Sequence, residues 1–406
     1  MRRPDDLPSV VAPEPFEAPI QAVVVPRGDL ERCGPIVDQV LGALEGASFK
    51  RIVLLGSAPG ARWSGAALPR ESELTTPKGT CHLDAEALSL LEGYAPFSRA
   101  EVKSFDSELG ELLVEALQRR WPAALLLPVL VGSVGEDDRL RIGHTLRHVL
   151  DERTLLVAAA ALPQLEGDVG ALLDRSGEAS VGGSGDFDAL GVLHAALGPG
   201  DRGVLVSRPS GDGCVGVLFP GRWPAVASLG PEDRRALGRI AEEGVAAAVH
   251  GRLAPPLGEL SPRLRQGGGA FVTLTERKRL RGCMGRLSSD SVAGAVAHAA
   301  RMAAQSDPRF NPLRPDDLAR IELEISVLGP FEAIASPADF EPGRHGLLLT
   351  SGFHRGLLLP QVATEHSLGR AEFLEALANK AGLPPGGWKD AKLERFGVEA
   401  FAPRPI

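Results

Sequence analysis

Four short apolar runs in the first half of the chain limit its fold more than any other feature of the sequence. Each is too short for a buried helix and has the length of a buried strand. The runs occupy residues 22–25, 52–55, 125–131 and 155–159, and stretches with helical periodicity lie at 35–44, 85–91, 107–119 and 140–150. Strands that alternate with helices predict an α/β fold with a mostly parallel sheet.

The segments that follow predict how this first domain is completed. Residues 177–191 are rich in Gly and Ser, which is typical of a loop over the sheet. Residues 203–207 and 215–219 predict a terminal β-hairpin, because the intervening segment 209–213 combines Pro, Gly and Asp.

A cluster of Pro and Gly at 220–224 indicates a boundary, and an amphipathic helix is predicted at 231–249. The chain is therefore predicted to contain a Pro-rich lead (1–19), an α/β domain (20–225) and a second domain (226–406). In the second domain, strands are predicted at 269–274 and 322–328, helices at 291–305 and 370–381, and hairpin arms at 346–350 and 356–359. This order of elements predicts an α+β fold.

Composition narrows the classes of function. The 406 residues are 44% hydrophobic and 24% charged, as in ordinary globular proteins. No apolar stretch has the length of a membrane span or of a signal peptide, so we expect a cytoplasmic protein without a membrane partner. Acidic residues are concentrated before Pro231, and the basic cluster 277–281 is short and lacks aromatic residues for base stacking. Nucleic acid is therefore not the leading partner, and RNA or nucleotide binding is the weakest alternative.

The four cysteines, Cys33, Cys81, Cys214 and Cys283, lie far apart and form no C-x-x-C pair. This spacing suggests neither a zinc knuckle nor a disulfide framework, and it predicts free thiols. We expect no cofactor.

The segment Leu280–Gly285 is the best candidate for a functional site. Gly282 and Gly285 permit a positive φ and a close backbone approach, which predicts a bend that turns amides and the Cys283 thiol toward one cavity. Neighbouring basic residues would favour the thiolate and attract an anion if they point inward. Alternatively, Cys283 is a small apolar residue packed in a tight hairpin. The basic residues are Arg277, Lys278, Arg279, Arg281 and Arg286.

The second domain resembles the AMMECR family. The resemblance spans about 130 residues and rests on seven ordered segments: 271–274, 280–285, 307–310, 322–328, 345–347, 355–362 and 380–384. It implies an α+β fold and a site around the cysteine, without a settled reaction. We take Cys283 and His345, the best available general base, as candidate catalytic residues. The candidate ligand-binding residues are Arg281, Gly282, Gly285, Asp307, Arg309, Arg355 and Gln361.

These assignments have structural alternatives. Arg281 and Arg309 are open to ion pairs with Asp307 or Glu324, and Asp307 is more readily explained as a turn cap before Pro308. His345 is also open to a turn role. Gln361 and Lys380 are better explained by backbone hydrogen bonds or a solvated helix face.

The first domain resembles the MEMO family, which is similar to the class III extradiol dioxygenases. The resemblance rests on Thr76-Pro77-Lys78-Gly79 followed by Asp84 and on residues 127–132. In that family, His residues after the first and second strands hold a metal with later ligands. The corresponding segments here, 26–30, 56–60, 107–111 and 158–163, contain no His. We therefore expect no metal and a scaffolding or dimerisation role, with a pocket in which Arg27 and Glu108 bind an anion or a polar metabolite as the alternative.

MEMO and AMMECR proteins accompany a radical-SAM protein in a set called AmmeMemoRadiSam, and this chain resembles both non-radical components fused. The resemblance implies an accessory or catalytic component of a modification system. The radical-SAM pattern C-x-x-x-C-x-x-C is absent from the sequence, so the iron-sulfur chemistry would belong to a partner. The competing hypothesis is a non-enzymatic adaptor that docks a protein partner, and a homo-oligomer is compatible with either.

Overall fold

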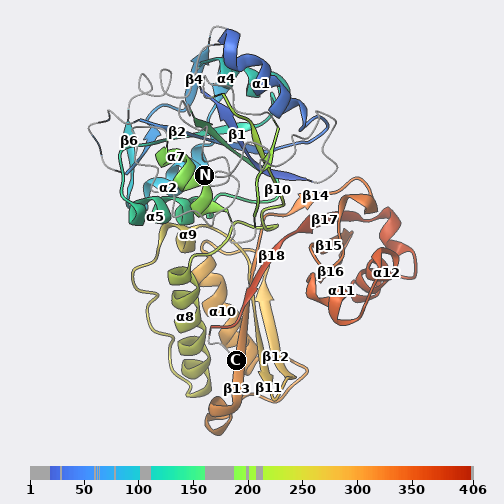
Figure 1. Ribbon diagram of the computed structural model, residues 1–406. Coiled ribbons are helices and arrows are strands. Elements are labelled where there is room, and N and C mark those ends of the chain that lie inside the picture. The colour runs from blue at the N-terminus through green and yellow to red at the C-terminus, as the bar shows by residue number, and fades with distance from the viewer. Residues whose placement is uncertain are drawn as a thin grey trace, which may run out of the picture. The chain divides into compact units, whose positions relative to one another are not determined.

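The computed structural model describes residues 19–27, 30–58, 61, 63, 65–76, 79–100, 111–160, 187–197, 201–206 and 214–403 (Figure 1). It divides into two compact units, the first ending at Trp223 and the second beginning at Pro224.

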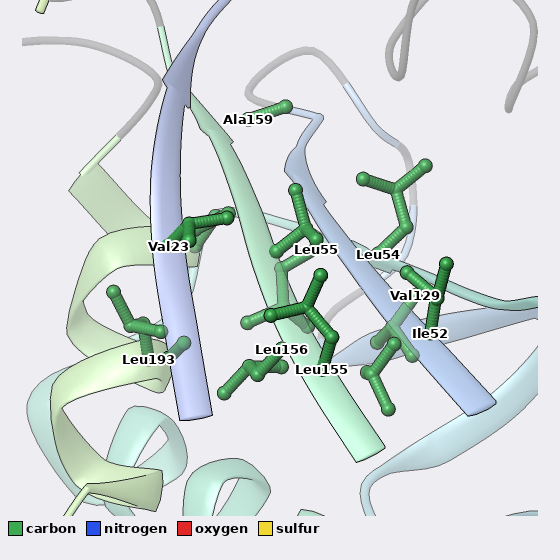
Figure 2. Close-up of a cluster of buried hydrophobic side chains, with 14 of the residues drawn as sticks. Val23, Ile52, Leu54, Leu55, Val129, Leu155, Leu156, Ala159 and Leu193 are labelled. Atoms are coloured by element: carbon green, nitrogen blue, oxygen red, sulfur yellow. The ribbon is translucent and has the colours of Figure 1, made fainter. Parts of the chain in front are cut away.

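The centre of the first unit is a parallel sheet in the order β7-β2-β8-β1. These four strands coincide with the four apolar runs of the sequence, which confirms that prediction. Nearly every residue in them is buried, because helices cover both faces. Figure 2 shows side chains from all four strands and Leu193 of a covering helix in one apolar cluster. The bounds are β1 (Ile20–Pro26), β2 (Arg51–Ser57), β7 (Leu125–Val131) and β8 (Thr154–Ala160).

The edges of this eight-stranded sheet are not parallel. On one side β3 (Ala66–Pro69) runs antiparallel to β7 and carries β6 (Phe97–Ala100). On the other side β10 (Val217–Pro220) runs antiparallel to β1 and pairs with β9 (Val204–Leu205). The predicted terminal hairpin is thus confirmed, while its turn at 209–213 lies outside the described residues. A separate two-stranded ribbon joins β4 (Glu73–Thr76) and β5 (Gly79–His82).

The helices of this unit largely follow the predicted stretches. Residues 107–110 lie outside the described part, and the prediction of a loop at 177–191 is wrong from Phe187 onward. Helix α7 begins there, because burial of Ala189, Val192 and Leu193 outweighs the low helix propensity of Gly191. The bounds are α1 (Leu30–Gly42), α2 (Ala85–Glu92), α4 (Glu111–Arg120), α5 (Glu136–Leu146) and α7 (Phe187–Ala196).

A buried ion pair explains one polar residue of the MEMO-like pattern. Arg51 Nε donates to Asp84 Oδ2 at 2.7 Å, and Arg51 Nη1 donates to the Val149 carbonyl at 2.7 Å. Asp84 also caps α2 by accepting the Ala87 N–H at 2.9 Å. Asp84 therefore anchors a helix to the sheet.

The prediction of four free thiols is wrong at two positions. Cys33 and Cys214 form a disulfide with their Cα atoms 5.8 Å apart. The bond joins α1 to the chain just before β10, and a separation of 181 residues gives no spacing signal for it. Cys81 and Cys283 are free.

The second unit begins with helices packed on one face of an antiparallel sheet in the order β12-β11-β13-β18. Ala270, Val272 and Leu274 alternate along β11 and bury their side chains against α10 and α8. The helix prediction at 231–249 is confirmed, and the helix predicted at 291–305 begins one residue later because Ser291 caps it. The bounds are α8 (Pro231–Val249), α9 (Pro262–Arg265), β11 (Ala270–Glu276), β12 (Arg279–Arg286), α10 (Val292–Gln305), the 3₁₀ helix η3 (Pro315–Arg320), β13 (Ile321–Leu328) and β18 (Val398–Phe401).

A second antiparallel sheet, in the order β14-β17-β15-β16, carries two short helices over a core that includes Phe340 and Phe373. The predicted hairpin arms and the predicted helix at 370–381 are found here. Both sheets are antiparallel with helices on them, so the α+β prediction is confirmed. The bounds are β14 (Glu332–Ala333), η4 (Pro337–Asp339), β15 (Gly346–Ser351), β16 (His354–Leu358), α11 (Gln361–Glu365), α12 (Arg370–Lys380), η5 (Gly387–Asp390) and β17 (Lys392–Phe396). None of the described helices combines the length and apolar composition of a membrane-crossing segment.

Candidate functional site

Cys283 lies within strand β12, two residues after a register shift at Arg281, rather than on the predicted bend. The hairpin turn is earlier, at Arg277 and Lys278, whose φ values of 50° and 62° place both residues in the left-handed region. Gly282 and Gly285 do not have positive φ angles. A Cβ on Gly282 would overlap the Ala303 carbonyl, and one on Gly285 would overlap the Phe271 ring. Both glycines therefore serve close packing, and the predicted positive φ is wrong.

The Cys283 side chain lies on the sheet face opposite α10. Cys283 pairs with Thr273 across β11 and β12, and Thr273 pairs with Glu324 across β11 and β13. Paired residues share a face, so the three side chains form one row across three strands. The Thr273 hydroxyl donates to Cys283 Sγ at 3.4 Å, which fixes the direction of both side chains.

Asp307 holds the backbone beneath the thiol. Its Oδ2 accepts the Cys283 N–H at 2.8 Å, and its Oδ1 accepts the Arg309 N–H at 3.1 Å. Its carboxylate also accepts from Arg309 Nε at 3.0 Å and Nη2 at 2.8 Å. Hydrogen bonds from Arg309, together with the N–H groups of Cys283 and Arg309, lower the pKa of Asp307 to about 2 despite its burial. Asp307 is thus a buried anchor, which agrees with the turn-cap alternative.

The Arg309 side chain extends from Asp307 to the surface. Its side chain is 55% exposed although its Nε and Nη2 are bound to Asp307. Nη2 also donates to the Cys283 carbonyl at 3.3 Å. Hydrogen bonding to Asp307 raises the pKa of Arg309, with smaller contributions from Cys283. The outer edge of a fixed guanidinium therefore lies beside Cys283, where it can donate to an anion.

Lys380, at the end of α12, is a second cation at this site, and it was not among the selected site residues. It interacts electrostatically with Cys283 and Arg309. Although the residue keeps access to solvent, desolvation lowers the pKa of Lys380, Cys283 raises it and Arg309 lowers it. Lys380 opens the segment 380–384, which carried part of the family resemblance, so a signal for it was present in the sequence.

Helix α11 reaches the other side of the same sheet face. Gln361 Nε2 donates to the Ser326 hydroxyl of β13 at 3.3 Å. Glu365, at the end of α11, acts on Glu324, and desolvation followed by this like charge raises the pKa of Glu324. The structure thus brings Gln361 to the sheet that carries Cys283.

The remaining predicted site residues, Arg281, Arg355 and His345, lie at three different places in the second unit. Arg281 Nη1 donates to the Asn311 carbonyl at 2.7 Å and Nη2 lies 3.8 Å from Asp317, rather than pairing with Asp307 or Glu324. Arg355 is exposed on β16, and the described residues show no hydrogen bond or ion pair between it and Cys283. His345 is buried before β15, where its Nδ1 accepts the Glu341 N–H at 3.0 Å.

The expected basic neighbours are also placed differently. Arg277 and Lys278 form the tip of the hairpin, and Arg286 pairs with Ala270 on the α10 face, where it acts on His298. The cations beside Cys283 come instead from Arg309 and Lys380, which are distant in sequence.

A cavity of about 260 Å³ lies away from this site. It is lined by α8, the segment 254–260 and Ala297, and it includes none of the residues around Cys283. Over the part of the chain that the structure describes, no group of three or more His, Cys, Asp and Glu side chains is arranged to hold a metal ion.

The MEMO-like positions of the first unit are described in part. Arg27 follows β1, donates from Nη1 to the Ser57 carbonyl at 3.2 Å and from its N–H to the Ala160 carbonyl at 2.9 Å. Ser57 Oγ accepts the Ala189 N–H of α7 at 3.0 Å. Polar groups thus hold together the carboxyl ends of three parallel strands. Residues 28–29, 59–60, 107–110 (with Glu108) and 161–163 lie outside the described residues.

Comparison with known proteins finds a family match for each of the two regions of the chain. A family model described as AMMECR1 matches residues 238–401, and one described as Memo-like protein matches residues 7–163. Protein Mbar_A1807 of Methanosarcina barkeri is 43% identical over 150 residues, which are 35% of this chain and 74% of the relative. A protein of Methanothermobacter thermautotrophicus is 39% identical over 185 residues, 43% of this chain and 96% of the relative.

Among solved structures, the uncharacterized protein PH0010 from Pyrococcus horikoshii is 33% identical, with a TM-score of 0.40 over 43% of this chain and 93% of that one. The assignment to a family rests on the large share of each relative that the sequence matches cover. This chain belongs to the AMMECR1 family and joins a Memo-like region to its AMMECR1 region.

Proposed function

We propose that the AMMECR1 region binds a small anionic ligand beside Cys283 and that Cys283 reacts with it as a nucleophile. The observation that carries this proposal is the half-exposed Arg309 guanidinium, which Asp307 and the Cys283 carbonyl hold beside the thiol. A guanidinium fixed in this way loses little freedom when it binds an anion.

Electrostatics supports an anion over a neutral ligand. Asp307 offsets one of the two positive charges of Arg309 and Lys380, which leaves about one net positive charge near the thiol. At a partly exposed site such a charge is worth up to about 1 kcal/mol, or about fivefold in affinity. In the reaction, Sγ forms a bond to an electrophilic carbon, the leaving group departs with its bonding electrons, and the thiol proton passes to solvent.

The test is protection of Cys283 by inorganic phosphate. Iodoacetamide alkylates the native protein, and mass spectrometry follows Cys283 separately from Cys81. Phosphate is expected to slow labelling at Cys283 and not at Cys81, which is buried. Unchanged labelling at Cys283 over the full range of phosphate concentration contradicts anion binding. Labelling no faster than in a urea-denatured control contradicts a reactive thiol.

Variants connect the protection to the two cations. Lys380→Met and Arg309→Gln are each expected to weaken phosphate protection about fivefold. Arg235→Gln removes an exposed arginine of α8, whose ion pair with Glu232 is 4.0 Å long, and Lys389→Met removes an exposed lysine. Both controls are expected to bind phosphate like the parent. Because Arg309 also pairs with the buried Asp307, Lys380→Met is the decisive variant if Arg309→Gln misfolds.

We also propose that the chain works with a radical-SAM protein as part of a modification system. The support is the fusion of Memo-like and AMMECR1 regions in one chain. Native purification from its source is expected to retain a radical-SAM protein in stoichiometric amount. Its consistent absence under mild conditions, with chemical cross-linking, counts against this partner.

A scaffold role for the Memo-like unit is the second candidate. It is supported by Arg27 and Ser57, whose polar groups bind neighbouring backbone at the ends of β1, β2 and β8. On this proposal, Arg27→Met lowers stability without changing the reactivity of Cys283. Bound metal in the natively purified protein, lost in Arg27→Met, contradicts a purely structural role.

The proposed compartment is the cytoplasm, and the disulfide tests it. Disulfides persist in oxidising compartments and are rare in the cytosol. On this proposal the Cys33–Cys214 bond forms only when the protein is oxidised, so cells lysed into a thiol-trapping reagent are expected to yield both cysteines in reduced form. A fully bonded pair in fresh lysate contradicts this location.

A further inference from the structure

The row of side chains through Cys283 has opposite charges at its two ends. Thr273 lies at the centre, Cys283 on one side and Glu324 on the other, all on the face opposite α10. Arg309 and Lys380 lie toward the Cys283 end. The sheet therefore presents a fixed charge gradient across three strands.

The acidic end consists of two carboxylates from different elements. Glu324 belongs to β13 and Glu365 to α11, and desolvation, followed by the like charge of Glu365, raises the pKa of Glu324. An ammonium group between like carboxylates relieves that repulsion. Desolvation and Glu365 are the causes of the raised pKa of Glu324, and no cation is among them.

An amide beside the acidic end has an unused polar atom. Gln361 Nε2 bonds to Ser326, and Gln361 Oε1 is buried without a hydrogen-bond partner. If the amide is turned over, the buried atom becomes the nitrogen, so one polar atom lacks a partner in either orientation. Such a group is costly, and because protein covers this atom, a buried water or a small shift of α11 would have to complete it.

We propose that this face binds a small dipolar ligand of dipeptide size, with its carboxylate at Arg309 and Lys380 and its ammonium at Glu324 and Glu365. This inference rests on the proposed function, because it names the class of ligand for the same site. Cys283 then faces the part of the ligand next to its carboxylate.

The spacing of the strands sets the size. Neighbouring strands lie about 4.8 Å apart, so the Cα atoms of Cys283 and Glu324 are separated by about 10 Å. Each charged end of a ligand lies about 2.8 Å from its partner group, so the ligand itself bridges less than the whole separation. Two extended residues span at most about 7 Å, whereas the charges of one α-amino acid are much closer together.

The test compares two probes that differ only in the amino group. Glycylglycine and N-acetylglycylglycine are titrated against the iodoacetamide labelling of Cys283 in the full chain. Glycylglycine is expected to give half-protection at about tenfold lower concentration. Glu324→Gln and Glu365→Gln are expected to reduce this difference, while protection by N-acetylglycylglycine stays the same. Glu232→Gln, which alters a carboxylate of α8 that is 94% exposed, is the matched control.

The outcomes separate this inference from the proposed function. Equal protection by both probes, with phosphate still effective, overturns the dipolar ligand and leaves the anion site in place. Protection by neither probe nor phosphate overturns both. A preference for glycylglycine that persists in both glutamine variants overturns the assignment of the ammonium to Glu324 and Glu365.

Discussion

The Asp307 carboxylate accepts the backbone N–H of Cys283 at 2.8 Å and so ties the strand that carries the thiol to the loop that follows α10. The same carboxylate holds Arg309, whose outer edge is exposed. One buried group thus positions both the thiol and the guanidinium of the proposed site.

The pH dependence of stability is expected to reveal this anchor. The folded-state pKa of Asp307, about 2, lies below its ordinary value of 3.8, so the carboxylate stabilises the folded state above pH 4. This contribution is lost as the pH falls from about 4 to about 2. Its size is about 1 to 2 kcal/mol, since solvent at the half-exposed Arg309 screens the pair.

Asp307→Asn isolates that contribution. The free energy of unfolding, measured in urea, is expected to be about 2 kcal/mol lower in the variant at pH 7, because Arg309 and the Cys283 N–H lose a charged acceptor. The difference between parent and variant should shrink toward pH 2. A difference that stays constant over this range contradicts the depressed pKa.

Substitution of Gly282 is expected to damage the packing of β12. A methyl group there would overlap the Ala303 carbonyl of α10, so Gly282→Ala should cost about 2 kcal/mol of stability. Gly42→Ala is the control, because a Cβ at Gly42 has no atom within 4 Å. Equal unfolding free energies for Gly282→Ala and the parent would show that strand and helix separate easily.

The buried ion pair of the first unit is expected to be sensitive to loss of either partner. Arg51→Met leaves the Asp84 carboxylate buried without its cation and should cost about 3 kcal/mol. Arg119→Met breaks an exposed pair with Asp38 and should cost less than about 1 kcal/mol. Similar losses in the two variants, measured by urea unfolding, would be incompatible with the buried pair.

Removal of the disulfide is expected to lower stability under oxidising conditions. The Cys33→Ala/Cys214→Ala variant should lose about 3 kcal/mol of unfolding free energy, because the cross-link restricts the unfolded chain. Reductant should bring the parent close to the variant and leave the variant unchanged. A parent whose unfolding midpoint does not respond to reductant would contradict a stabilising bond.

The buried strands and the family of the second unit were accessible from sequence because their signals are local. The four apolar runs became β1, β2, β7 and β8, since a strand buried on both faces must be apolar throughout. The edge of the sheet where β3 runs antiparallel to β7 and carries β6, and the start of α7 at Phe187, depend on tertiary contacts. The Cys33–Cys214 pair, 181 residues apart, carries no local signal.

Only part of the candidate site could be predicted from the sequence. Cys283, Asp307 and Arg309 lie together as a family pattern suggests, yet the charge beside the thiol comes from Arg309 and Lys380 rather than from the adjacent basic residues. The adjacent basic residues do not surround the thiol, because side chains alternate between the two faces along β12 and because Arg277 and Lys278 form the hairpin turn. The roles of these residues remain predictions.

The most direct measurement of the central claim is the ratio of the rate constants with which iodoacetate and iodoacetamide alkylate Cys283. In both reactions Sγ displaces iodide from carbon, and only the charge of the reagent differs. Relative to N-acetylcysteine, the ratio is expected to be about fivefold higher in the native protein and to fall in Lys380→Met. A ratio equal to that of N-acetylcysteine, unchanged in Lys380→Met, would contradict an anion site at Cys283.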